Sequence, residues 1–397
     1  MKAFLASSFL IIATLVGHFS HGASVLTTGS ADNSVRVAFQ KLIITVGKSP
    51  GPVAVADVNH DGKLDLLIAN TGDETLTVLL GDGEGHFTRA PGSLCRTGRG
   101  PNDIAVGDFN GDGHPDLVIA NTGTPYLTLL LGDGKGSFRP SAKSPFATDS
   151  HPHVHGVVAA DFNRDGKLDA VTESWGNNKI LLLLGDGAGN LATPGVPFDV
   201  GKRPYERLRT ADFNHDGDPD VVTTDLDENA VTILLGDGHG GFRQATGSPF
   251  AAGVFPWAVA IGDINKDGNL DLAVLPYDRD IRDPQQLGVS VLLGDGTGKF
   301  RMMSKTPLSL SGCRGPDHVA IGDVNGDGHP DIVVSCAQSN NLFFFLGTGS
   351  GEFQRTSYDL PYIGWSGMAV ADLNGDKKED VVVSNFEAGT VTVLLSK

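Results

Sequence analysis

The sequence has 397 residues, of which 40% are hydrophobic, so it carries enough apolar material for a packed protein and does not have the composition of a disordered chain. Its formal net charge of −17 at pH 7 would repel a phosphate backbone, which argues against a nucleic acid as a partner. The 53 glycines indicate many tight turns.

The first 22 residues have the pattern of a signal peptide: Lys2 precedes an apolar stretch from Ala3 to Val16, and small residues follow it. The apolar stretch is short for a membrane span, and no later segment matches it. We therefore expect export to the extracellular space or the periplasm, a linker over residues 23–35, and a mature chain that is monomeric and lacks a transmembrane segment.

An acidic motif, D-x-N-x-D-x-x-x-D, then occurs seven times. Successive copies begin 51, 53, 51, 51, 60 and 49 residues apart, which is a repeat and not a coincidence. The copies begin at Asp57, Asp108, Asp161, Asp212, Asp263, Asp323 and Asp372.

Each copy lies among the same apolar runs. In the first repeat, Val53–Ala56 precedes the motif, while Leu66–Ala69 and Leu76–Leu80 follow it. A glycine-rich turn, here Gly81–Phe87, leads to a fourth and less regular strand, and such turns are typical of hairpins. Four antiparallel strands in each of seven repeats predict an all-β, seven-bladed β-propeller over residues 36–397. We expect its innermost strands to be buried on both faces.

The two ends of the chain complement each other. The last repeat stops at Val391–Leu395 and lacks a fourth strand, whereas Phe39–Val46 resembles that missing strand. The N-terminal strand is therefore predicted to complete the last blade and close the ring, which removes free sheet edges.

The acidic motif has the ligand order of a calcium loop. Oxygen-bearing side chains stand at positions 1, 3, 5 and 9, position 6 is glycine in six copies, and position 7 can offer its backbone carbonyl. Hard oxygen ligands favour Ca²⁺ over zinc or copper. The expected ligands are Asp57, Asn59, Asp61, Lys63, Asp65, Asp108, Asn110, Asp112, His114, Asp116, Asp161, Asn163, Asp165, Lys167, Asp169, Asp212, Asn214, Asp216, Asp218, Asp220, Asp263, Asn265, Asp267, Asn269, Asp271, Asp323, Asn325, Asp327, His329, Asp331, Asp372, Asn374, Asp376 and Asp380.

The alternative to calcium is a set of turns held by their own side-chain hydrogen bonds. Calcium is favoured because three like charges recur within nine residues and would repel one another without a cation. Up to seven ions are expected. The seventh site should be the weakest, because Lys377 stands at the glycine position and Lys378 adds a second positive charge.

These loops and turns resemble the FG-GAP/VCBS repeat family, which includes the propeller of integrin α subunits. The resemblance covers Phe39 to Lys397, although Leu191 replaces the phenylalanine of the third glycine-rich turn. It implies calcium loops on one face of a seven-bladed ring and ligands on the opposite face. Members include adhesion proteins and lectins, and related propellers occur in polysaccharide lyases, so the resemblance leaves the function open.

The opposite face carries residues that differ from repeat to repeat, which favours recognition there. Trp and Tyr beside Asp, Glu and Asn suit a carbohydrate, since rings stack on sugars while carboxylates and amides bind hydroxyls. Loops after the second strands are expected to add Glu173, Trp175 and Asp225. The candidate ligand-binding residues are Asn102, His155, Tyr205, Glu206, Arg207, Trp257, Asp317 and Trp365.

A binding or adhesion module, with a glycan or an extracellular protein as partner, is favoured over an enzyme. The alternatives are a lyase-like enzyme using His155, Tyr205, Glu206 and Arg207, and a protein-adhesion scaffold. A central metal site formed by His151, His153 and His155 with Glu206 is a further alternative to a solvated loop.

Three cysteines fit an oxidising compartment. Cys313 precedes the inner strand of the sixth repeat and Cys336 ends its second strand, so antiparallel pairing would bring them together in a disulfide. Cys95 is expected to be a free thiol.

Overall fold

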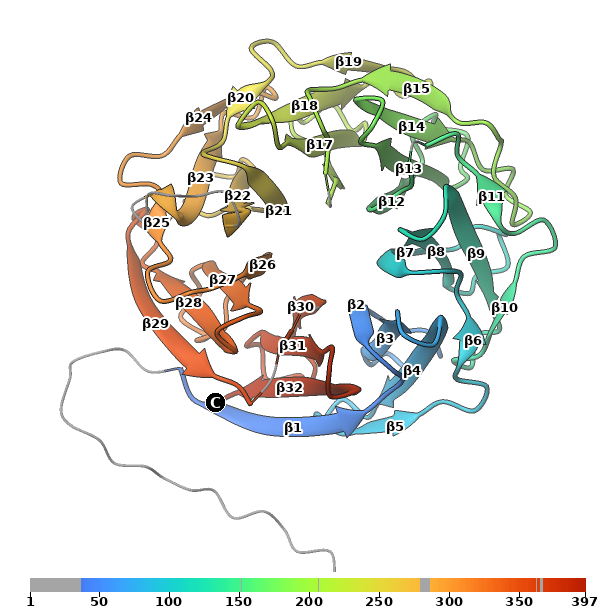
Figure 1. Ribbon diagram of the computed structural model, residues 1–397, viewed down its shortest axis with the longest axis horizontal. Coiled ribbons are helices and arrows are strands. Elements are labelled where there is room, and N and C mark those ends of the chain that lie inside the picture. Colours follow the sequence, from blue (N-terminus) through green and yellow to red (C-terminus); the bar gives the residue numbers. More distant parts are fainter. Residues whose placement is uncertain (1–36, 151, 206, 279–285, 362, 365–366) are drawn as a thin grey trace, which may run out of the picture. The chain divides into compact units, whose positions relative to one another are not determined.

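The computed structural model describes residues 37–150, 152–205, 207–278, 286–361, 363–364 and 367–397. The strands form seven separate sheets, each with a path of four antiparallel strands. The innermost strands of neighbouring sheets contact one another in a closed cycle, β2–β7–β12–β16–β21–β26–β30 and back to β2. The predicted seven-bladed propeller is therefore confirmed, with the sheets arranged radially around a central channel (Figure 1).

Each blade uses four strand positions. The innermost strands are β2 (Pro50–Ala56), β7 (Pro101–Gly107), β12 (Val157–Ala160), β16 (Arg209–Ala211), β21 (Pro256–Gly262), β26 (Pro316–Gly322) and β30 (Met368–Ala371). The second strands are β3 (Asp65–Asn70), β8 (Asp116–Asn121), β13 (Asp169–Ser174), β17 (Asp220–Asp225), β22 (Asp271–Pro276), β27 (Asp331–Cys336) and β31 (Asp380–Asn385). The third strands are β4 (Thr75–Gly81), β9 (Tyr126–Gly132), β14 (Lys179–Leu183), β18 (Ala230–Gly236), β23 (Gly288–Gly294), β28 (Asn341–Gly347) and β32 (Thr390–Ser396).

The outer strands vary in length, from three or four residues in five blades to seven residues in the other two. They are β5 (Phe87–Arg89), β10 (Phe138–Pro140), β15 (Val196–Asp199), β19 (Phe242–Gln244), β24 (Phe300–Met302), β29 (Phe353–Asp359) and β1 (Phe39–Thr45). Four blades add a second outer piece, namely β6 (Cys95–Arg96), β11 (Phe146–Ala147), β20 (Phe250–Ala251) and β25 (Leu308–Ser309). Between the two outer pieces the hydrogen-bond ladder to the third strand is interrupted, and a side-chain hydroxyl takes the place of a backbone carbonyl as acceptor. Ser248 Oγ, for example, accepts the backbone N–H of Ile233 at 3.0 Å.

Ring closure by the N-terminal strand is confirmed. β1 pairs antiparallel with β32 over its whole length, from Phe39 opposite Ser396 to Thr45 opposite Thr390. From Lys41 to Thr45 exposed and half-buried residues alternate, as expected for one face packed on a core. Phe39 also reaches the next blade, where its ring lies 5.4 Å from those of Phe344 and Tyr358. The last blade therefore joins the two ends of the described chain.

Several innermost strands are less buried than the sequence predicted. In β2, five of the seven residues are only half-buried, whereas all six residues of the second strand β3 are buried. The difference arises because innermost strands face the central channel on one side, while second strands lie between neighbouring sheets. Their valines and alanines make an apolar channel wall.

The part of the chain that the structure describes contains no helix with the length and hydropathy of a membrane span.

The predicted disulfide is confirmed: Cys313 and Cys336 are bonded, with Cα atoms 5.4 Å apart, and Cys95 is a half-buried free thiol. A crosslink across 23 residues restricts the unfolded chain. The double variant Cys313→Ala/Cys336→Ala is therefore expected to lose about 3 kcal/mol of unfolding free energy. Urea unfolding followed by fluorescence measures this, with Cys95→Ser as the matched control. Equal midpoints for the double variant and the wild type would contradict the expectation.

Candidate functional site

The acidic loops follow the innermost strands and share one internal arrangement. In the first loop, Asp57 accepts the backbone N–H groups of Asp61 and Gly62 with its two oxygens, and Asn59 Oδ1 accepts the Asp61 N–H at 3.0 Å. Positions 1, 3 and 5 in all seven loops repeat these three bonds. The side chains of Asp57 and Asn59 are therefore turned into the loop, and that of Asp61 joins them by accepting hydrogen bonds from Asn59 Nδ2 and the Lys63 N–H.

Position 9 has a second task that the sequence did not reveal. Asp65 is fully buried at the start of β3; its Oδ2 accepts the N–H of Val58 and its Oδ1 accepts that of Gly81 at the end of β4. Every blade repeats this clamp between position 2 and the end of the third strand. Burial raises the pKa of this carboxyl, to about 7 in Asp220 and Asp331. The ninth residue thus ties the loop to the sheet.

The loops offer oxygen donors suited to Ca²⁺. Side-chain oxygens at positions 1, 3 and 5 and the carbonyl of position 7 are hard ligands, and each oxygen of the position-9 carboxylate keeps a second lone pair. Burial raises the pKa of the Asp65 carboxyl most, and the negative charges of Asp57 and Asp61 also raise it. A bound cation would offset these two charges. Another acidic group lies in a glycine-rich turn. There, among the described residues, Asp82, Glu84 and His86 bring their ligand atoms within 4.8 Å of one another. The oxygen donors of the acidic loops therefore fit calcium. Of the donor positions, position 9 is the one most occupied by hydrogen bonds to other parts of the blade.

Backbone geometry distinguishes the seventh loop. Gly62 at position 6 has φ +79°, and Lys377 adopts φ +70° at the same position. A side chain in this left-handed region costs about 1 kcal/mol. The Cβ of an alanine at position 62 would meet no atom within 4 Å, so backbone strain alone decides its effect.

We expect Lys377→Gly to raise the free energy of unfolding by up to about 1 kcal/mol and Gly62→Ala to lower it by a similar amount. Urea unfolding over a range of free calcium concentrations measures both, because the part of each change that does not vary with calcium reports backbone strain and not ion affinity. Gly72 is not a suitable glycine for comparison, because the added Cβ of Gly72→Ala would lie 2.9 Å from Ser49 Oγ and cause a steric clash as well. Opposite signs for the two variants are required, and a loss in both would contradict the strain account.

The opposite side of the ring, where the innermost strands begin and the second strands end, is called the mouth face here. It brings several sequence-predicted residues together in blades 2 to 5. The His155 ring lies 4.4 Å from Tyr205, and Tyr205 lies 4.8 Å from Trp257. His153 Nε2 is 2.9 Å from His155 Nε2, and Asn102 Nδ2 donates to the His155 carbonyl. These side chains form a continuous aromatic cluster.

The members of this aromatic cluster differ in exposure. Trp257 is only 6% exposed, belongs to a hydrophobic core and stacks on Tyr277 with ring centroids 4.3 Å apart. Its faces are therefore occupied within the protein. Tyr205 is half-buried, as is Trp175, whose ring lies 5.8 Å from it. These two rings keep surface that a ligand could contact.

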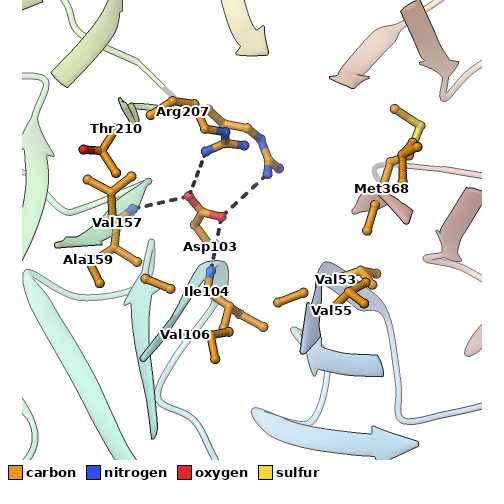
Figure 2. Close-up of a pocket in the computed structure, with 16 residues that line it drawn as sticks. Val53, Val55, Asp103, Ile104, Val106, Val157, Ala159, Arg207, Thr210 and Met368 are labelled. Carbon is orange, nitrogen blue, oxygen red and sulfur yellow. Dashed lines mark hydrogen bonds and ion pairs between the residues drawn. The ribbon is translucent and has the colours of Figure 1, made fainter. Parts of the chain in front are cut away.

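A group of charged side chains lines the central channel. Asp103 on β7 pairs with Arg207 Nη1 at 3.8 Å and with Arg209 Nη1 at 3.5 Å, and its carboxylate also accepts the N–H of Val157 on β12 (Figure 2). Residues of blades 2, 3 and 4 are thereby linked. The sequence analysis did not single out Arg209, because this residue begins the innermost strand β16 and the candidates were sought in the loops before the innermost strands.

The remaining candidates are placed as follows. Asp317 is buried in β26 and its Oδ2 lies 3.1 Å from His318 Nδ1. Glu206, Trp365 and His151 lie outside the described residues. The proposed triple-histidine metal site therefore keeps His153 and His155 as its described members.

Glu173 and Asp225 are strand residues and do not lie in loops as expected. Glu173 Oε1 accepts the backbone N–H groups of His155 and Gly156, so it positions the histidine loop. Burial raises the pKa of Glu173 to about 7. Burial likewise raises the pKa of Asp225, to about 7. Their fully buried positions follow from the sheet register, which the sequence alone did not give.

Asp225 occupies the place that Asn70, Asn121 and Asn385 fill in other blades. Those amides donate to a threonine hydroxyl on the third strand, whereas Asp225 Oδ2 accepts from Thr232 and its buried Oδ1 has no partner among the described residues. Glu228 adds a like charge, and the backbone of Gly201 donates nearby. A neutral amide suits this place better than a carboxylate.

We therefore expect Asp225→Asn to stabilise the protein in a pH-dependent way. Because the folded pKa is raised, the wild type binds a proton more tightly when folded and loses stability as pH rises from about 4 to about 7. The gain from Asn should be small near pH 4 and on the order of 3 kcal/mol at pH 8. Urea unfolding at both pH values tests this, with the exposed Asp199→Asn as control. A gain independent of pH would contradict the titration of Asp225.

Comparisons with known proteins agree with this architecture. The chain is 32% identical to cartilage acidic protein 1 of Mus musculus over 136 residues, which are 34% of this chain and 20% of that protein. It is 22% identical to the T-cell immunomodulatory protein of Rattus norvegicus over 257 residues, or 63% of this chain and 41% of that protein. It therefore spans between a fifth and two fifths of these two relatives.

Among solved structures, an Agrocybe aegerita lectin with specificity for non-reducing terminal N-acetylglucosamine superposes with a TM-score of 0.55 at 15% identity, covering 88% of this chain and 96% of the lectin. This likeness concerns the fold alone. The family model for FG-GAP-like repeats matches residues 57–119, 108–172, 212–274, 282–334 and 323–383, which together make up more than half of the chain. The chain therefore belongs to the FG-GAP-like repeat family.

Proposed function

We propose that this chain is a secreted propeller, stabilised by calcium in its acidic loops, that binds an extracellular ligand on its mouth face. The observation that carries the calcium part is the common arrangement of positions 1, 3 and 5 in all seven loops. The Cys313–Cys336 disulfide supports an oxidising compartment. The loops are structural sites, since the protein supplies most of the ion's coordination shell.

The ligand part rests on the mouth face of blades 2 to 5. Trp175 and Tyr205 keep exposed ring surface beside His153, and Asn102 adds an amide close by. Partly exposed aromatic rings with neighbouring polar groups suit stacking on a sugar ring. A glycan is therefore the proposed ligand class, and a protein partner bound over the same face is the second candidate.

A glycan-array binding measurement on the mature protein tests this proposal, run once with calcium and once with chelator. Calcium-dependent binding should fall at least tenfold in Trp175→Ala and in Tyr205→Ala. Tyr126→Ala is the matched control, because this exposed tyrosine begins β9 on the same face in blade 2. A folded, calcium-loaded protein that binds no glycan would remove the carbohydrate proposal and leave the protein-adhesion alternative.

A further inference from the structure

The central channel contains a cavity of about 470 Å³ with an apolar wall and one charged corner. The wall comes from innermost strands of blades 7, 1, 2 and 3, and includes Val53, Val55, Ile104, Val157 and Met368. Figure 2 shows these side chains around the opening, with Met368, Val53 and Val55 across from Asp103. Its volume is sufficient for a small organic molecule.

The charged corner is formed by Asp103, Arg207 and Arg209. Both oxygens of Asp103 already accept backbone N–H groups, from Ile104 at 3.1 Å and Val157 at 3.3 Å. The ion pairs to the two arginines, at 3.8 and 3.5 Å, are longer than a charge-assisted hydrogen bond of about 2.8 Å. One carboxylate thus serves two guanidinium groups at a distance.

Arg209 retains donors on the cavity side. Its side chain is 32% exposed and lines the cavity, and among the described residues its well-formed hydrogen bond runs from Nη1 to the carbonyl of Leu208 at 2.8 Å. A guanidinium has five N–H donors. Arg207 is more enclosed and has additional contacts, so Arg209 is the group with donors to spare.

The electrostatics of this corner favour an added anion. Burial lowers the pKa of the Arg209 guanidinium, and the neighbouring Arg207 lowers it further against the opposing effect of Asp103. A second anionic group beside Arg209 would reduce the repulsion between the two guanidinium groups, and guanidinium binds carboxylates in bidentate geometry. The valine-lined wall would meanwhile take up an apolar body.

We propose that the central channel binds a small organic carboxylate with an apolar body, its carboxylate on Arg209 and its body against the apolar wall. This site depends neither on glycan binding by the aromatic cluster nor on the acidic loops. A purely inorganic anion would leave the wall unused, and a neutral apolar molecule would leave the guanidinium without its partner.

Isothermal titration calorimetry of the full mature chain with sodium octanoate tests the proposal. One octanoate should bind per chain, and Arg209→Gln should weaken its binding at least tenfold. Arg243→Gln on the exposed outer strand β19 should leave binding unchanged. Octan-1-ol and sodium sulfate, which each offer one half of the ligand, should bind at least tenfold more weakly.

Three results would overturn the proposal: no octanoate binding to the folded wild type, equal binding by Arg209→Gln, or sulfate binding as tight as octanoate. Thermal unfolding shows whether Arg209→Gln remains folded. If it does not, Val55→Asp supplies a second variant, since a carboxylate in the apolar wall should weaken octanoate binding at least tenfold while thermal unfolding shows that the variant stays folded.

Discussion

Removal of calcium is expected to destabilise the protein more than any single substitution in the ring. At free calcium tenfold above its dissociation constant, each loop would contribute about 1.4 kcal/mol, so seven independent loops would contribute about 10 kcal/mol. That total is comparable with the whole stability of an ordinary domain. The reason is local: without an ion, three acidic positions within nine residues repel one another in every blade.

Thermal unfolding in calcium and after dialysis against chelator measures this effect. Added calcium should restore the midpoint of unfolding, whereas magnesium at the same concentration should restore it poorly, because the loops supply more ligands than magnesium favours. Asp57→Asn should lower the calcium-dependent midpoint more than Asp372→Asn, since Lys377 and Lys378 already weaken the seventh loop. A midpoint that chelator leaves unchanged would favour loops held by hydrogen bonds alone.

Deletion of β1 is the second change with a large expected effect. Removing residues 37–45 would expose the edge of β32, whose seven residues pair with β1, and would uncover the core beneath Phe39, Leu42 and Ile44. Lost ladder bonds at about 1 kcal/mol each and three partly buried apolar side chains sum to several kcal/mol, on the order of 7 kcal/mol. The shortened chain should aggregate through its open edge or unfold at low urea concentration.

Size-exclusion chromatography and urea unfolding of the deletion variant measure this, with Gln40→Ala, an exposed position on the same strand, as control. A synthetic peptide of residues 37–46 added in trans should restore part of the lost stability, because it can pair with β32. Wild-type stability in the deletion variant would mean that the ring does not need β1.

The blade count, the ring closure and the disulfide could all be predicted because each leaves a mark along the chain. The acidic motif counts the blades, Phe39–Val46 matches the strand that the last repeat lacks, and Cys313 and Cys336 flank one hairpin. Each of these features depends on residues within one repeat or on a match between the two ends of the repeat pattern.

Contacts between blades were beyond the sequence. Nothing in the spacing places Arg209 of blade 4 beside Asp103 of blade 2. Within blade 5, the spacing likewise does not stack Trp257 on Tyr277 so that its ring is enclosed. The clamp formed by Asp65 was missed for a related reason: its partner at Gly81 lies 16 residues away and contributes only a backbone N–H. Side-chain direction and lateral packing decide these features, and the repeat pattern does not record them.

The way in which β1 closes the ring also sets how the molecule should respond to mechanical load. Phe39 lies opposite Ser396, so the two ends of the paired strands point to the same side of the last blade. A pull applied at these two residues would act across the ladder and open it one hydrogen-bonded pair at a time, as a zipper opens. A pull between Thr45 and Ser396 would instead shear all seven pairs at once. Tension applied at the junction of the strand ends should therefore open the ring at a lower force than tension along the strands.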